Sequence, residues 1–304
     1  MIDGIINVYK EKGYTSFDVV AKLRGILKQK KIGHTGTLDP MAEGVLIVCL
    51  GKATKLVDIL ITSSKEYKAS MQLGIKTDTE DVTGEILKES DLWKSLSNDE
   101  IIEAVNSFVG KYSQLPPMYS AIKKDGKKLY EYARAGIEVE RQKREVEIIF
   151  IDNISIELPY VNFDVKCSKG TYIRSLCRDI GDKLGCGASL SGLIRNELHG
   201  MRASDAFKLS DIERLRDEDE LDKCIIPMDA LLSDYERLDI KPQASKLLSN
   251  GIKLKPISFY PSKQGSICDG TAEKLYRIYD NDKLMALYRY DESNDIFVPF
   301  KMFL

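Results

Sequence analysis

The loop GHTGTLDP at residues 33–40 holds the carboxylate that could most readily do chemistry in this chain. Asp39 stands immediately before Pro40, and proline disfavours a helical backbone for the residue that precedes it. The sequence therefore predicts an extended Asp39 whose carboxylate points outward, in a loop where Gly33 and Gly36 let another backbone segment approach closely. On local sequence alone, a turn aspartate that accepts hydrogen bonds from its own backbone is the more ordinary interpretation.

Four other residues could take part in a site with Asp39. Arg174 falls in the first turn of a predicted helix, where the helix dipole disfavours a cation, and a buried carboxylate partner would explain its place. The alternative is that its side chain reaches solvent. Tyr67 and Tyr172 could be core residues or could stack on an exposed base. His34 could contact phosphate or a base edge, or make a structural hydrogen bond.

Helices are expected at three places, because apolar residues recur there at helical spacing. The first covers 16–31, with a Thr-Ser cap at its start and Gly33 as its stop. The second begins at the capping box Ser-Asn-Asp-Glu and covers 97–110. The third covers 170–185 and carries Arg174. The apolar stripe of the first helix is Phe17, Val20, Leu23 and Leu27, and that of the third is Ile173, Leu176, Cys177, Ile180 and Leu184.

Strands are expected over 45–51, 66–74 and 161–167, from an apolar run and from alternation of apolar with polar residues. The stretch at about 115–144 begins with two prolines and contains an Asp-Gly turn, which predicts a projecting hairpin-and-helix insertion. Neither G-x-G-x-x-G nor a P-loop sequence occurs, so dinucleotide and P-loop folds are not expected.

The order of these elements predicts two domains of unequal size. The larger, residues 1–237, is α+β, contains the insertion and is closed by an acidic segment near its end. Short strand-like pieces separated by Asp and Asn turns then indicate a small β-rich domain over 238–304.

Composition restricts the function classes. Of 304 residues, 43% are hydrophobic and 30% charged, and the net charge is −2, which argues against a generic basic nucleic-acid coat. The charge is uneven, because 22–31 holds five basic residues and no acidic ones, and 121–144 holds eight basic against four acidic. Such segments are often solvated helix faces, but local patches could contact phosphate.

Metal binding and membrane insertion are not expected. Six scattered cysteines without a C-x-x-C pair, and only two histidines, indicate reduced, mostly buried thiols rather than a zinc site. The first residues do not resemble a signal peptide, and the longest apolar run, 45–50, is too short to span a bilayer. We therefore expect a cytoplasmic protein.

Five blocks of sequence together resemble the TruB family, the tRNA pseudouridine-55 synthases. They are GHTGTLDPMAEGVLIVCLGKATK at 33–55, KEYKA at 65–69, MYSAIKKDGKKLYEYARAGIEVER at 118–141, GTYIRSLCRDIGDKLG at 170–185 and, more weakly, LSGLIRNELHG at 190–200. They occur in the family's order. The resemblance implies the pseudouridine synthase fold, with a mixed, largely antiparallel sheet flanked by helices, followed by a PUA-like C-terminal domain.

The resemblance also implies roles for single residues. Asp39 matches the catalytic aspartate, Tyr67 the tyrosine that stacks on the target base, and Arg174 the arginine that pairs with the aspartate. The positions expected around the flipped nucleotide are His34, Tyr172, Leu193 and Lys10. The insertion resembles the segment that clamps the tRNA T-arm, and the lysines expected on RNA are Lys123, Lys124, Lys127 and Lys128.

The implied reaction detaches uracil from C1′, turns it and rejoins it through C5, and it needs neither a metal nor a redox cofactor. An ionised carboxylate could act as a nucleophile or take a proton from the sugar, and the sequence leaves both routes open. The expected partner is tRNA, with no obligatory protein partner, and the expected state is a monomer. The family's early lysine-proline motif is Lys10-Glu11 here, so the first loop could be set differently.

Three rival interpretations stay open at this stage. A non-catalytic RNA-binding or chaperone protein would share the basic and aromatic residues without requiring Asp39 and Arg174 together. A sibling synthase would act on a different uridine or RNA. A glycoside hydrolase would require two carboxylates facing one bond, and the loop at residues 33–40, called the signature loop below, offers one.

Overall fold

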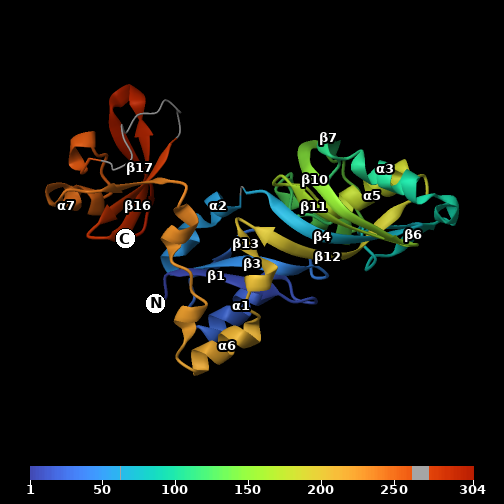
Figure 1. Ribbon diagram of the computed structural model, residues 1–304, viewed down its shortest axis with the longest axis horizontal. Coiled ribbons are helices and arrows are strands. Elements are labelled where there is room, and N and C mark those ends of the chain that lie inside the picture. Colours follow the sequence, from blue (N-terminus) through green and yellow to red (C-terminus); the bar gives the residue numbers. More distant parts are fainter. Residues whose placement is uncertain (62, 262–273) are drawn as a thin grey trace.

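The computed structural model describes residues 1–61, 63–261 and 274–304, and a long curved sheet forms the centre of their larger part (Figure 1). The main path of this nine-stranded sheet runs in the order β1-β3-β12-β4-β11-β10-β7. The strands along it are β1 (Gly4–Lys10), β3 (Glu43–Leu50), β12 (Ala188–Leu198), β4 (Lys65–Leu73), β11 (Tyr160–Cys167), β10 (Arg144–Glu157) and β7 (Gly110–Gln114). β2 (Ile32–His34) joins β3, and β13 (Met201–Arg202) joins β12. Neighbours pair antiparallel except β12 and β3, which are parallel.

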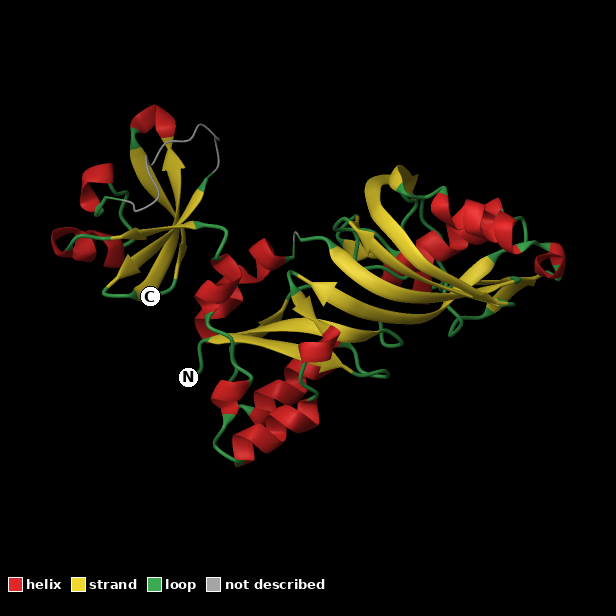
Figure 2. Ribbon diagram, viewed as in Figure 1, coloured by secondary structure: helices red, strands yellow, loops and turns green. Residues whose placement is uncertain are grey.

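Two pairs of helices cover the two ends of this sheet (Figure 2). Helices α1 (Ser16–Ile26) and α6 (Leu209–Asp217) share one hydrophobic cluster with β1 and β3. Helices α3 (Asn98–Asn106) and α5 (Ile173–Lys183) share a second cluster with β4, β11 and β10. The expectation of a mixed, largely antiparallel sheet flanked by helices is therefore confirmed. The short helix α2 (Val57–Leu60) follows β3, and no helix within the described residues is long and apolar enough to cross a membrane.

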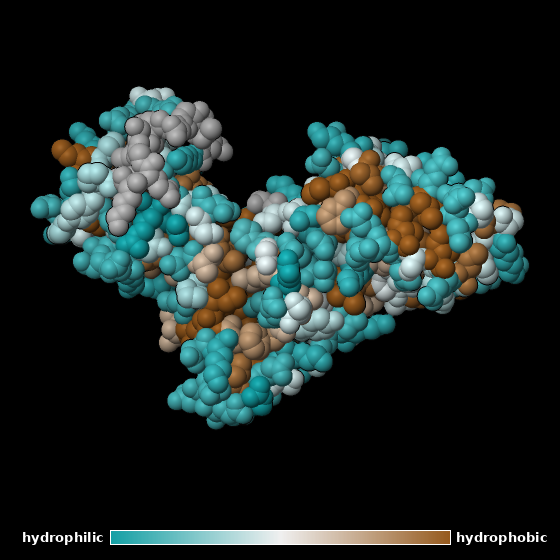
Figure 3. All heavy atoms as spheres, in the orientation of Figure 1, coloured by the Kyte–Doolittle hydropathy of each residue, from teal (hydrophilic) through white to brown (hydrophobic). Residues whose placement is uncertain are grey.

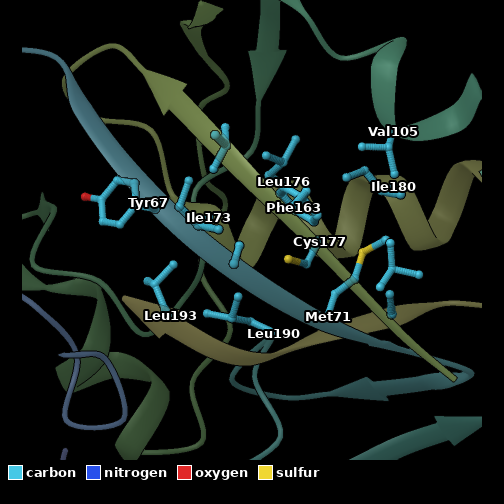
Figure 4. Packing of buried hydrophobic residues seen from close by; sticks show 14 of the residues in the cluster. Tyr67, Met71, Val105, Phe163, Ile173, Leu176, Cys177, Ile180, Leu190 and Leu193 are labelled. Atoms are coloured by element: carbon cyan, nitrogen blue, oxygen red, sulfur yellow. The ribbon is translucent and has the colours of Figure 1, made fainter. Parts of the chain in front are cut away.

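The periodicity of β4 and α5 predicted their packing correctly. Tyr67, Ala69, Met71 and Leu73 of β4 are all buried, as are Ile173, Leu176, Cys177 and Ile180 of α5. Figure 4 shows the two sets packed against Phe163 of β11 and Leu190 of β12. The helix carrying Arg174 thus lies against the strand carrying Tyr67, and this packing fixes the distance between the two.

Two predicted helix ends are wrong. α1 stops at Ile26, well before Lys31, because residues 32–34 pair with β3, so the predicted stop Gly33 lies in a strand. Its buried face is centred on Val19, Val20 and Leu23, and Phe17, which was expected in the stripe, is 66% exposed.

The cap of α1 is Thr15, in a capping box with Asp18. α3 begins at the predicted capping box but ends at Asn106. Gly110, the predicted end of this helix, instead opens strand β7, which pairs with β10.

The insertion between β7 and β10 contains a hairpin and a helix, as predicted. β8 (Lys123–Lys124) and β9 (Lys127–Lys128) flank the Asp125-Gly126 turn, whose two residues both have positive φ, and α4 (Leu129–Arg134) follows. A separate two-stranded sheet is formed by β5 (Ile75–Thr77) and β6 (Ile86–Glu89). The loop between these two strands returns toward α5.

The C-terminal part forms its own four-stranded sheet around an aromatic core. Its strands are β14 (Glu236–Asp239), β15 (Leu275–Asp280), β16 (Lys283–Asp291) and β17 (Ile296–Met302), with α7 (Ser245–Ser249) beside them. This confirms the β-rich C-terminal domain, and the expected boundary between 237 and 238 falls inside β14. Figure 3 shows hydrophilic residues over the C-terminal part and over the α6 region.

Candidate active site

The signature loop connects β2 to β3 and is held from behind by buried polar side chains. The Leu38 amide donates to the Ser16 hydroxyl at 2.9 Å. The Lys10 ammonium, with no exposed surface, donates to the carbonyl oxygens of Pro40 and Ala42. Burial lowers the pKa of Lys10 to about 8. Lys10 therefore supports the loop backbone, and it lines neither of the cavities described below.

Asp39 faces Arg174, and the two side chains form an ion pair. The Arg174 Nε lies 2.9 Å from Asp39 Oδ2, and its second terminal nitrogen donates to Oδ1 at 3.3 Å. Among the described residues, the Asp39 carboxylate accepts no hydrogen bond from the backbone amides of its own turn. The geometry therefore departs from that of an ordinary turn aspartate.

Arg174 is 5% exposed, and its guanidinium is held by groups from three separate segments. It donates to the Thr79 carbonyl at 2.9 Å and to the Tyr119 carbonyl at 2.9 Å. A second carboxylate, Asp81, lies 3.9 Å from it and is itself buried. A buried cation with this many fixed acceptors has one orientation, and that orientation aims it at Asp39.

Burial raises the pKa of Asp39 above its ordinary value, the Arg174 guanidinium opposes that rise, and the Asp81 carboxylate adds to it. The Asp39 side chain keeps 37% of its surface open. Pairing with the Arg174 guanidinium and partial exposure to solvent both favour the ionised form of this carboxylate. The site thus presents a charged, oriented carboxylate.

Two cavities, of about 660 and 400 Å³, are lined by Asp39. Both are also lined by Tyr119, Tyr130 and Arg174. Of the other predicted site residues, the smaller cavity is lined by Tyr67, Tyr172 and Leu193. A larger cavity of about 750 Å³ lies beside the C-terminal sheet, and its lining contains none of these residues. We place the candidate site at the two cavities, where a paired carboxylate and aromatic rings converge.

Tyr67 and Leu193 lie at one end of the main core cluster, and the Tyr67 hydroxyl points away from it (Figure 4). Burial raises the pKa of Tyr67 to about 12, so this phenol is neutral. His34 lies on β2 and lines neither cavity. Its Nδ1 is buried with no hydrogen-bond partner in the described structure, and burial lowers the pKa of its ring.

Sequence reasoning missed Arg195, which is 1% exposed and lies directly opposite Tyr67 in the sheet. Its guanidinium donates to the carbonyls of Val45, at 2.7 Å, and Gly36, at 3.3 Å, and it lies close enough to the Tyr67 hydroxyl for the two groups to interact electrostatically. It thereby joins the signature loop to the tyrosine. Asp81 and Glu80 were also missed, although two neighbouring acids in TDTEDVTG, followed by a glycine, could have drawn attention to that loop.

The four lysines expected on RNA all lie on the β8–β9 hairpin. Lys123 and Lys127 are exposed, whereas Lys124 and Lys128 are half-buried. The Lys124 ammonium donates to the Glu140 carbonyl at 2.8 Å.

No His, Cys, Asp and Glu cluster able to hold a metal ion occurs among the described residues. Cys49, Cys167, Cys177, Cys186 and Cys224 are free and buried, as predicted, and Cys268 lies outside the described residues.

Comparison with known proteins identifies one family over most of the chain. Residues 24–173 match the TruB family pseudouridylate synthase N-terminal domain, and residues 174–233 match the tRNA pseudouridylate synthase B C-terminal domain. The chain belongs to the TruB family of pseudouridylate synthases, which confirms the resemblance stated above.

Relatives and solved structures extend the likeness to nearly the whole length. The chain is 46% identical to tRNA pseudouridine synthase B of Clostridium tetani over 94% of its own length and 95% of that protein's. It is 45% identical to the protein of the same name from Clostridium perfringens, over 96% of each. A Cbf5-Nop10-Gar1 complex contains a chain with a TM-score of 0.73 at 29% identity, covering 99% of this chain and 85% of that one. An H/ACA RNP bound to a substrate RNA containing 2′-deoxyuridine gives a TM-score of 0.73 at 27% identity, with the same coverage. The pseudouridine synthase fold is thereby confirmed.

Proposed function

We propose that this protein isomerises a uridine in the T-loop of tRNA, at position 55, to pseudouridine. The observation that carries the proposal is the Asp39–Arg174 ion pair, opening onto cavities lined by tyrosines, in a chain of the TruB family. Relatives that are nearly half identical over almost their full length are named tRNA pseudouridine synthase B, which supports tRNA as the substrate.

Asp39 is the residue that acts on the nucleotide. Its carboxylate either attacks carbon as a nucleophile or removes a proton from the sugar, and both steps require the ionised form. Arg174 keeps that form charged and aims it at the reacting atoms, because its guanidinium contacts both carboxylate oxygens. This isomerisation involves no net oxidation or reduction and no phosphoryl transfer, so its chemistry requires no redox cofactor.

The target base reaches Asp39 by leaving the loop of the RNA. Flipping costs a few kcal/mol, and stacking on an aromatic ring offsets part of that cost. Tyr67, buried except at the cavity, provides such a ring, and Leu193 beside it excludes water from the base. We assign Tyr172 to the same pocket and Lys10 and His34 to its supporting wall.

The hairpin lysines Lys123, Lys124, Lys127 and Lys128 hold the RNA backbone, and the PUA-like C-terminal domain adds to the RNA surface. We further propose that the protein works in the cytoplasm as a monomer, with tRNA as its partner and no obligatory protein subunit. Light scattering during gel filtration, with and without tRNA, tests the monomer.

Pseudouridine mapping on tRNA treated with the purified protein tests the activity and the target position together. Asp39→Ala should abolish pseudouridine formation while tRNA binding survives, and Asp152→Asn, which neutralises an exposed aspartate of β10, should leave activity unchanged. Modification by Asp39→Ala at the wild-type rate would contradict the proposal. Modification at a uridine outside the T-loop would keep the reaction and exclude the target.

A further inference from the structure

The loop between β5 and β6 contains a buried acid, Glu80, that the proposed reaction does not use. The residue is 8% exposed, and its backbone has a φ of +65°, which is unfavourable for a residue with a Cβ. The backbone is nevertheless pinned, because the Leu190 amide donates to the Glu80 carbonyl at 3.0 Å. A charged residue held in a strained conformation needs a structural or functional reason.

The Glu80 carboxylate accepts from two hydrogen-bond donors of α5 and faces a more distant cation from the insertion. The Ser175 hydroxyl of α5 donates to Oε2 at 2.6 Å, and the Arg178 guanidinium of α5 pairs with Oε1. Arg141, near the end of the insertion, lies 4.0 Å from the same oxygen. Both arginine side chains are less than one-fifth exposed, so these contacts are shielded from solvent.

The same two arginines hold the two ends of the insertion. Arg178 donates to the Leu115 carbonyl at 2.9 Å, where the insertion leaves β7. Arg141 donates to the Pro116 carbonyl at 2.9 Å, so it ties the segment that returns from the insertion to the segment that enters it. Glu80 therefore sits at the base of the insertion and neutralises the side chains that close it.

Glu80 also directly follows Thr79, whose backbone carbonyl holds Arg174 in place. The neighbouring Thr79 carbonyl and the Tyr119 carbonyl of the insertion both accept from Arg174, each at 2.9 Å. A second contact joins these segments, because the Tyr119 hydroxyl donates to Asp78 at 3.2 Å. The loop around Glu80 and the insertion thus share one cation, and that cation aims Asp39.

We propose that Glu80 is a positioning residue that locks the insertion and Arg174 into a single unit, so that seating of RNA by the insertion sets the geometry of Asp39. This inference rests on the proposed function of the site. Glu80 touches neither the cavities nor the base, so its effect passes through the Thr79 carbonyl and the base of the insertion. Its removal should therefore slow the chemical step more than it weakens RNA binding.

The test compares Glu80→Gln with wild type in single-turnover pseudouridine formation on tRNA, at saturating enzyme and across pH. Glutamine keeps the size of the side chain but loses the charge that the two arginines require. We expect the rate to fall about ten-fold, with a tRNA Kd changed by less than about three-fold. The acid limb of the rate should also move to higher pH, because a loosened Arg174 opposes the raised pKa of Asp39 less.

Two further variants make the result specific. Arg141→Met removes one tie of the insertion at a less buried position and should change the rate in the same direction by about three-fold. Asp182→Asn is the control. It removes an exposed ion pair between Lys76 and Asp182 of α5, the helix that carries Ser175 and Arg178, and it should behave as wild type.

An unchanged rate in Glu80→Gln would overturn the inference. So would a loss that is equal at every pH, because that result would indicate general destabilisation without displacement of Arg174. Turnover by Asp39→Ala would instead overturn the proposed function beneath it. An inactive Asp39→Ala beside a fully active Glu80→Gln would remove the inference alone.

Discussion

Asp39 depends on the cation that faces it for its charge and for its direction. The carboxylate is surrounded by a second acid, Asp81, and by the ammonium of Lys10 behind the loop. Of these neighbours, Arg174 alone contacts both carboxylate oxygens in the described structure. The pH dependence of the reaction should therefore respond to this residue first.

Arg174→Met should move the acid limb of the single-turnover rate to higher pH, in addition to lowering the maximum. The raised pKa of Asp39 means that activity is present above that pKa and is lost as pH falls through it. Removing the arginine takes away the main influence that opposes the rise, so the ionised form persists only at higher pH. Arg174→Lys keeps a cation there, and its acid limb should stay near that of wild type. Coincident profiles for the methionine variant and wild type would contradict the proposed pairing role.

At the scale of elements, the site depends on a close crossing between β3 and β12. Gly44 of β3 has a φ of +98°, and a Cβ there would lie 2.3 Å from the carbonyl oxygen of Arg195. The crossing brings Arg195 under the signature loop and opposite Tyr67. Glycine is required at position 44 by both its conformation and its neighbour.

Gly44→Ala should lower the free energy of unfolding by about 3 kcal/mol or more. The substitution adds backbone strain, and its Cβ also clashes with Arg195 unless β3 and β12 move apart. Gly110→Ala is the matched control. Its φ is +101° but a Cβ there meets nothing within 4 Å, so the loss should stay near about 1 kcal/mol. Urea unfolding measures both, and equal losses would show that the crossing tolerates a methyl group.

The hairpin β8–β9 should contribute charge to RNA binding, and the chemical step should not depend on that charge once the RNA is bound. Replacing Lys123, Lys124, Lys127 and Lys128 by glutamine should weaken tRNA binding. It should also reduce the slope of log K against log salt by about 0.7–0.9 for each phosphate that the variant no longer neutralises. The rate at saturating enzyme should be unchanged. Lys88→Gln with Lys94→Gln, outside the hairpin, serves as the control, and a wild-type slope in the hairpin variant would exclude it from the RNA surface.

The individual helices and strands of this fold could be predicted from the sequence, whereas the contacts between them could not. Strand β4 and helix α5 show their buried faces in their own periodicity, so Tyr67 and Arg174 were placed correctly on elements. The end of α1 was wrong because strand pairing by 32–34, a non-local contact, shortens the helix. Arg195 and Glu80 were missed because their partners lie far along the chain, at Val45 and at Arg178.

The family resemblance of the sequence blocks around Asp39, Tyr67 and Arg174 predicted a contact that the spacing of these residues could not predict. The family match indicated that these three residues meet, and the Asp39–Arg174 distance of 2.9 Å agrees with it. Physical reasoning from sequence had no means to bring residues 39 and 174 together, since nothing in either segment specifies the other.

At the scale of the whole molecule, the C-terminal sheet is joined to the body by a shared apolar cluster. Leu287 and Phe303 pack in this cluster with Ile5, Leu60 and Leu232. An ion pair between Lys301 and Asp58 lies beside it, and the Lys55 ammonium donates to the Met302 carbonyl at 2.6 Å. The orientation of this domain is therefore set by packing.

Phe303→Ala should weaken that junction and lower the free energy of unfolding by about 3–5 kcal/mol. Phe303 is 1% exposed, and its truncation would leave a cavity in the junction cluster. Phe17→Ala removes a ring that is 66% exposed and should cost less than about 0.5 kcal/mol. Thermal or urea unfolding compares the two, and similar losses would indicate that Phe303 does not pack in the described junction.

The parallel pairing of β12 with β3 also has a consequence for the order of events during synthesis. The signature loop leaves the ribosome early, but its support at Arg195 belongs to a strand that ends at Leu198. Until that strand emerges, β3 has no neighbour on that side and the carbonyls of Gly36 and Val45 lack their donor. Contacts between residues so far apart in the sequence also form slowly during folding. A nascent chain should therefore acquire activity late and abruptly, once residues near 198 are free to cross the sheet.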